Sequence, residues 1–150
     1  MPTEYSKPEE EIFFLTVDQV LILNREVILR YSPSESFNVI NPVALESAVS
    51  QPQASWGGRF LYESIAAMAA AYIISLVQNH AFENGNKRVG FAAASTFLRM
   101  NGRRLTLTED EAVELTLRVA TGDLEREDAT DILQRNMEDL RPLPRSNELL

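Results

Sequence analysis

One long segment of this chain is apolar on every side of a helix, and this limits where the segment can lie. Between Tyr62 and Asn79, large apolar residues recur at helical spacing, and alanines fill much of the opposite side. A helix that is apolar all round needs cover from other elements, so we expect it at the centre of the fold. Its uncharged stretch, Ser64 to Val77, is shorter than the roughly 20 residues that span a bilayer. The sequence therefore predicts a buried core helix.

A second buried helix is predicted soon after the first. Apolar residues recur at helical spacing from Lys87 to Met100, and Asn101-Gly102 is a typical helix terminus. Residues 80–86 therefore connect two core helices. We expect this connection to be held rigidly at both ends.

Further helices are expected to cover this pair. Helix starts are indicated by the capping-box patterns Thr16-Val17-Asp18-Gln19 and Thr108-Glu109-Asp110-Glu111. The expected helices are 17–31, one from Asn41-Pro42 to Pro52, one from Thr108 to Gly122, and one from Glu125 to about Leu140. Only Arg103 to Leu107 looks extended. The prediction is an all-α, compact single-domain bundle of about six helices, with the active loop between the two buried central helices.

The expected domain occupies residues 12–141, with a flexible leader at 1–11 and a flexible tail at 142–150. At 150 residues and 45% hydrophobic content, the chain is long enough to bury one continuous core. On the first helix, Asn24 interrupts the apolar stripe and is expected to be a hydrogen-bonded core residue. The glycine-containing loop Gln53 to Phe60 suits either an ordinary surface turn or a flap that aligns a target.

Composition excludes several kinds of site. The chain has no cysteine, which excludes disulfides, thiolate nucleophiles and cysteine-based metal sites, and fits the reducing cytoplasm. We find no secretory signal, so a cytoplasmic protein without membrane attachment is expected. A net charge of −8 argues against direct binding of nucleic acid along a broad surface. Any anion is therefore expected to bind at one local site.

The run His80-Ala81-Phe82-Glu83-Asn84-Gly85-Asn86-Lys87-Arg88 is the densest group of functional side chains in the sequence. A tight turn at Gly85 before a helix can direct several N–H groups at one anion, and Lys87 and Arg88 add positive charge. His80 is the only histidine, and a histidine there suits a general base that deprotonates an attacking hydroxyl. Phe82 is expected to anchor the loop in the core. Taken singly, a histidine C-cap and an Asn-Gly-Asn turn have structural explanations, and only their combination indicates catalysis.

At these residues the sequence closely resembles the Fic/Doc (Fido) family, whose loop reads His-x-Phe-x-acid-Gly/Ala-Asn-Lys/Gly-Arg. Lys87 after Asn86 resembles the Doc (death on curing) branch, whereas AMP-transferring Fic proteins carry Gly there and a second Arg where this chain has Phe91. The resemblance extends from about Phe14 to Leu105 and includes Pro42 to Ala48 and Pro52 to Gly58.

The resemblance implies ATP and Mg²⁺ as cofactors, His80 as catalytic base, and phosphate binding by Gly85, Asn86, Lys87 and Arg88. It implies a toxin of a toxin–antitoxin module that phosphorylates a serine or threonine of elongation factor Tu, blocks translation, and is restrained by a cognate antitoxin. The acid that would hold the metal is Asn84 here, so only weak metal binding is expected at that position. Two alternatives remain open, namely a nucleotidyl transferase of Fic type, and a catalytically weak module that binds nucleotide or antitoxin.

Overall fold

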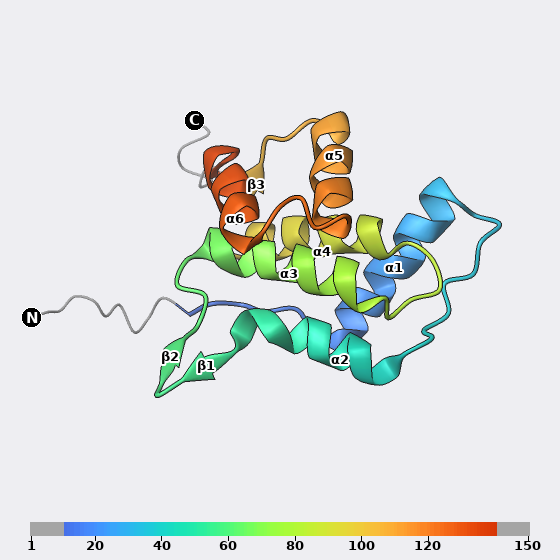
Figure 1. Ribbon diagram of the computed structural model, residues 1–150, viewed down its shortest axis with the longest axis horizontal. Helices are drawn as coiled ribbons and strands as arrows, with labels where there is room; N and C mark the ends of the chain where they lie inside the picture. Colours follow the sequence, from blue (N-terminus) through green and yellow to red (C-terminus); the bar gives the residue numbers. More distant parts are fainter. Residues whose placement is uncertain (1–10, 141–150) are drawn as a thin grey trace, which may run out of the picture.

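Six α-helices and four short strands form the regular structure of the computed structural model, which describes residues 11–140 (Figure 1). The helices are α1 Val17–Tyr31, α2 Pro42–Ser50, α3 Ile65–Asn79, α4 Asn86–Met100, α5 Glu109–Ala120 and α6 Arg126–Arg135, and a 3-10 turn, η1 Gln51–Gln53, continues α2. Antiparallel pairs join β1 Ser55–Trp56 to β2 Arg59–Phe60 and β3 Arg103–Leu105 to β4 Met137–Asp139. The predicted all-α fold is confirmed. The predicted tail and all but one residue of the predicted leader lie outside the described residues.

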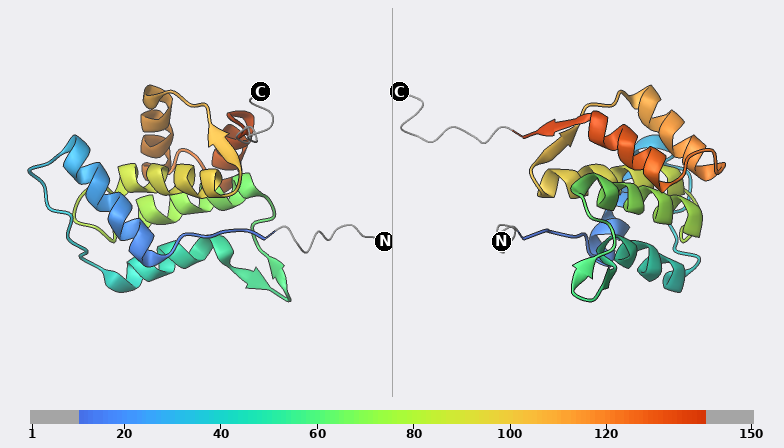
Figure 2. Two further views of the ribbon diagram at one scale, coloured as in Figure 1. Left: turned by 180° about the vertical axis from the view of Figure 1, so that it is seen from behind. Right: turned by 60° about the vertical axis from the view of Figure 1, so that its left-hand side comes forward.

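The two predicted core helices, α3 and α4, lie side by side at the centre. Helices α1 and α2 cover one side of the pair, and α5 and α6 cover the other (Figures 1 and 2). A methyl group on Gly90 of α4 would lie 3.0 Å from the Val77 side chain and 3.3 Å from the Ile73 carbonyl oxygen, both on α3. The helices therefore pack closely, which fixes both ends of the loop between them. No helix in residues 11–140 has both the length and the apolar character needed to cross a membrane.

Side-chain caps set where the helices begin. Thr16 accepts a hydrogen bond from the Gln19 N–H and Thr108 accepts one from the Glu111 N–H, so both predicted capping boxes are confirmed. Helix α3 begins later than the apolar pattern predicted, because the Ser64 hydroxyl accepts the Ala67 N–H at 3.0 Å and ends the preceding loop.

The last helix is shorter than predicted. It ends at Arg135, and the next residues form β4, which pairs with β3 in the predicted extended piece. Across this ladder, Arg103 forms an ion pair with Asp139 at 3.2 Å, and Arg104 pairs with Glu138. Strand pairing thus replaces the expected final turns of helix.

The glycine-containing loop before α3 forms the β1–β2 hairpin. Trp56, at the tip of this hairpin, is 82% exposed. The hairpin precedes the first turn of α3, whereas the loop at residues 80–85 follows its last turn, so the two lie at opposite ends of this helix (Figures 1 and 2). This placement favours an ordinary surface turn over a flap on the active loop.

Candidate active site

His80 ends α3 in a left-handed conformation. Its φ of 51° and ψ of 49° make it the one non-glycine residue with positive φ in the part of the chain that the structure describes. For a residue with a Cβ, this conformation costs about 1–2 kcal/mol and persists where surrounding structure imposes it. Its side chain is exposed. The backbone therefore presents the imidazole to solvent at the start of the loop.

The loop after His80 is fixed by a distant segment, residues 38–41, which connects α1 to α2. Phe82 forms an antiparallel bridge with Val39, and backbone N–H···O bonds of 2.8, 3.2 and 3.0 Å join residues 38–41 to residues 81–83. The Phe82 side chain, which we expect to anchor the loop, is 1% exposed. The loop at residues 80–85 is therefore held by the core on one side and by a second backbone segment on the other.

Asn86 closes the loop from the other end. Its amide oxygen accepts the Phe82 N–H at 3.1 Å, and its amide nitrogen donates to the Phe82 carbonyl at 2.9 Å. Its side chain, which the family resemblance assigned to the phosphate, thus shapes the loop. The Asn86 backbone N–H has no hydrogen-bond partner within residues 11–140.

Replacing Asn86 by Ala is expected to lower the free energy of unfolding by about 1–3 kcal/mol, because both Phe82 backbone groups lose their partner. Chemical denaturation of the purified variant measures this change. Asn136→Ala is the matched control, since the Asn136 amide donates a single hydrogen bond, to the Ile132 carbonyl, away from the loop. An equal loss in the two variants would argue against a special role of Asn86 in closing the loop.

The first turn of α4 is open to an anion. Gly85 is its N-cap, with φ of 84° and no capping side chain, and its carbonyl accepts the Val89 N–H at 2.8 Å. The N–H groups of residues 86–88 have no hydrogen-bond partner within residues 11–140. Free N–H groups at the positive end of a helix dipole form a binding site for phosphate or carboxylate. The first turn of α4 therefore has the backbone features that an anion site requires.

Two exposed, positively charged side chains lie at the N-terminus of α4. Lys87 and Arg88 both lie in the first turn of α4 and are exposed. The Arg88 guanidinium lies 4.6 Å from the centroid of the Tyr31 ring and donates a long 3.4 Å hydrogen bond to the Ser32 hydroxyl. Arg88 is therefore held against the end of α1, so Lys87 is the more adjustable of the two charges.

Asn84, the predicted weak metal ligand, is half-buried between the loop and the α1–α2 connection. Its amide nitrogen donates to the Ser36 carbonyl at 3.0 Å, which leaves the amide oxygen as the atom that can face a cation. No group of three or more His, Asp or Glu side chains that could hold a metal occurs in the described residues. Asn84 thus offers one neutral oxygen and contributes a structural bond that a carboxylate could not donate.

An apolar pocket adjoins the two cations, and sequence reasoning did not find it. It has a volume of about 330 Å³ between α1, α4 and α5, and Tyr31, Arg88, Phe91 and Val113 are among its lining residues. Phe91 stands where the AMP-transferring relatives have their second arginine, and here it adds to an apolar wall. An apolar pocket therefore lies beside the Lys87 and Arg88 side chains at this end of α4.

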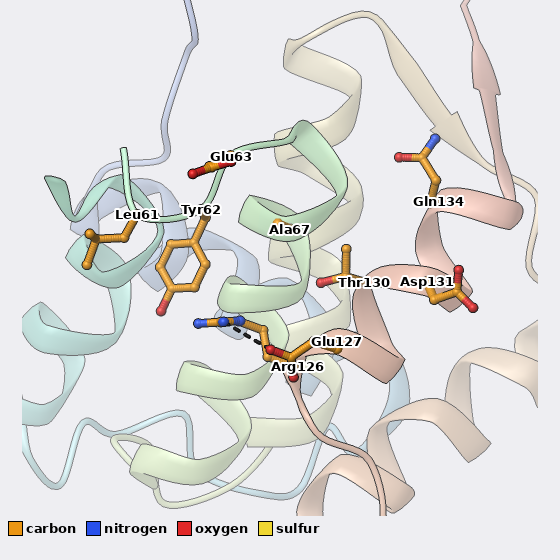
Figure 3. A pocket seen from close by; sticks show the side chains of 9 residues that line it. All are labelled: Leu61, Tyr62, Glu63, Ala67, Arg126, Glu127, Thr130, Asp131 and Gln134. Carbon is orange, nitrogen blue, oxygen red and sulfur yellow. Dashed lines mark hydrogen bonds and ion pairs between the residues drawn. The ribbon is translucent and has the colours of Figure 1, made fainter. Parts of the chain in front are cut away.

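A second pocket of about 370 Å³ lies at the other end of α3, against α6 (Figure 3). Its main cation, Arg126, lies 5.2 Å from the centroid of the Tyr62 ring and forms an ion pair with Glu127 at 3.1 Å. None of its lining residues belongs to the loop 80–88. The loop at residues 80–88, and not this pocket, is therefore the candidate active site.

Comparison with known proteins finds similar sequences. The model of the Fic/DOC family matches residues 14–98. Toxin Doc of Mycolicibacterium smegmatis is 44% identical over 81 residues, which are 53% of this chain and 62% of the relative, so the match spans less than two thirds of that toxin. Protein kinase doc of Escherichia phage P1 is 27% identical over 124 residues, which are 81% of this chain and 93% of that protein.

Proposed function

Because the chain belongs to the Fic/DOC family, we propose that it is a Doc-like toxin that transfers phosphate from ATP to a serine or threonine hydroxyl of a protein. The observation that carries this proposal is the open first turn of α4, with His80 at the other end of the same short loop. Elongation factor Tu is the target that the family resemblance implies. Its phosphorylation blocks translation.

The chemistry proposed for the loop consists mainly of positioning and electrostatics. The N–H groups of residues 86–88 and the Lys87 ammonium hold the terminal phosphates, and the apolar pocket beside Arg88 receives the base. His80 takes the proton from the target hydroxyl as its oxygen attacks the phosphorus atom. The bond from that phosphorus to the bridging oxygen breaks, and ADP leaves. Magnesium, when bound, would neutralise phosphate charge, and the Asn84 amide oxygen, at the position of the family's metal-binding acid, would face it.

Replacing Asn84 by Asp is expected to lower the magnesium concentration for half-maximal activity by roughly ten-fold. A tenfold change corresponds to about 1.4 kcal/mol, and a carboxylate near a divalent cation contributes more than this even in a partly solvated site. The same variant loses the hydrogen bond to the Ser36 carbonyl, so its stability is expected to fall by about 1 kcal/mol. Asn84→Ala is the control, because it loses that bond without gaining charge. Equal magnesium dependence in wild type and Asn84→Asp would place the metal elsewhere.

Nucleotidyl transfer of the Fic type is the second candidate. It needs the nucleotide to bind in the opposite sense, so that the α-phosphate, and not the γ-phosphate, faces His80. Phe91 replaces the arginine that the nucleotidyl-transferring relatives use, and this favours phosphate transfer. A binding module with little turnover is the third candidate, and it is supported by the neutral Asn84.

The test is intact-mass spectrometry of elongation factor Tu after incubation with the purified protein, ATP and magnesium. Addition of one phosphate supports the proposal, whereas addition of AMP supports nucleotidyl transfer. Unchanged mass with both wild type and Asn84→Asp contradicts the proposed target. We further propose that a cognate antitoxin restrains the protein, since one relative is named a toxin. Co-expression with candidate antitoxins, followed by a growth assay, tests this.

A further inference from the structure

Asn24 on α1 is fully buried, yet its amide has no hydrogen-bond partner within residues 11–140. Its exposure is 0%, and neither the amide nitrogen nor the amide oxygen is paired. The sequence-based expectation of a hydrogen-bonded core residue is therefore right about burial and wrong about hydrogen bonding. A buried polar group without a partner destabilises the folded state and is rare in native proteins. Such a residue needs an explanation beyond core packing.

The unpaired Asn24 amide lies next to Gly85, the N-cap of α4. A methyl group built on Gly85 would lie 2.9 Å from the Asn24 amide oxygen and 2.9 Å from the Ile28 side chain. The space beside the Gly85 Cα is therefore filled by the Asn24 amide and the Ile28 side chain. The one unpaired buried amide in the described residues therefore touches the turn that is expected to present N–H groups to a phosphate.

We propose that Asn24 is a positioning residue for the turn at residues 84–86, which leads into the phosphate-binding N–H groups of residues 86–88, and this inference rests on the proposed function. Its amide forms hydrogen bonds with the backbone of the turn when the turn closes on a phosphate. Gly85, which adopts positive and negative φ readily, allows the small peptide rotation that this needs. The Asn24 amide is unpaired before phosphate binds and paired afterwards. The free energy of these new hydrogen bonds therefore strengthens phosphate binding.

The proposal predicts opposite effects of one substitution. Leucine has nearly the shape of asparagine but no polar atoms, so Asn24→Leu removes the desolvation penalty from the free protein. We expect its melting temperature to rise by roughly 2–4 °C, because the variant no longer buries an unpaired polar group. A shift of this size is typical for a domain of this length. We also expect affinity for inorganic pyrophosphate and for magnesium-ATP to fall roughly five- to ten-fold, the size of one buried hydrogen bond. A residue with a packing role alone does not produce this combination.

The experiment combines thermal unfolding of the free proteins with calorimetric titration of pyrophosphate and magnesium-ATP. Asn24→Ala is the second variant. It has a cavity and a lower melting temperature, but its loss of affinity is expected to match that of Asn24→Leu. Ser75→Ala is the control, because the Ser75 hydroxyl is a buried group with a partner, the Ala48 carbonyl at 2.8 Å. It is expected to lower the melting temperature and leave both affinities unchanged.

The outcomes separate this inference from the proposed function. Wild-type binding of both ligands, with weaker binding by both Asn24 variants, supports the inference. Wild-type binding with equal affinities in the Asn24 variants overturns it and leaves the proposed function intact. A lower melting temperature of Asn24→Leu also overturns it, because the amide then has a stabilising partner. If wild type binds neither ligand, the proposed phosphate site is wrong and the inference fails with it.

Discussion

Replacing His80 by Asn is expected to lower the rate of phosphate transfer roughly 100- to 10,000-fold, the usual contribution of a general base. The imidazole is exposed at the start of the loop and is the only such group that the sequence supplies. Asparagine tolerates the left-handed backbone that His80 adopts, so the fold should be retained. The rate is measured from the mass of the modified target over time.

The control for this prediction is the stability of the same variant. We expect the melting temperatures of wild type and His80→Asn to agree within about 2 °C, because few contacts depend on an exposed side chain. His80→Ala is less suitable, because alanine disfavours positive φ. A loss of activity in that variant can come from a changed backbone as well as from the missing base. Retention of most of the activity in His80→Asn would show that another group accepts the proton.

Replacing Gly85 by Ala is expected to destabilise the protein by about 2–5 kcal/mol. Positive φ costs alanine about 1–2 kcal/mol, and the new methyl group at 2.9 Å from Asn24 and Ile28 adds about 1–3 kcal/mol of overpacking. Because the shifted residue is the N-cap of α4, phosphate binding is expected to be lost as well. Urea denaturation and pyrophosphate titration measure the two effects.

Gly102 provides the matched control for this substitution. Its φ of 82° is almost the same as that of Gly85, but a methyl group built on it would meet nothing within 4 Å. Gly102→Ala is therefore expected to be destabilised only by the unfavourable positive φ, about 1–2 kcal/mol, and to keep its phosphate affinity. Equal destabilisation of the two variants would show that the contacts of Gly85 with α1 contribute little.

The sequence predicted the helices well because the signals that place them are local. The capping boxes at Thr16 and Thr108 and the cap-proline pair Asn41-Pro42 each act within one turn, and all three helices begin where predicted. The burial of α3 also followed directly from its composition. The late start of α3 at Ile65 was missed because apolar residues before Ser64 continue the helical pattern without being helical.

What the sequence could not predict depends on contacts between distant residues. β4 forms because residues 137–139 meet Arg103–Leu105, and no local pattern indicates that pairing. In the site, the residue types were predictable but their partners were not. The Asn86 side chain bonds to Phe82, and the Asn84 amide donates to Ser36, which lies on the connection after α1. The missing partner of Asn24 likewise appears only when α1 and the turn are seen together.

The backbone pairing between residues 38–41 and 81–83 also determines what can be transplanted from this protein. A helical hairpin that receives residues 80–88 gains every functional side chain of the loop, but it gains no acceptor or donor for the backbone of residues 81–83. The connection between α1 and α2 supplies those partners here. Grafting the loop alone into a designed scaffold is therefore insufficient, and the smallest unit that carries the geometry includes the segment from α1 through α4.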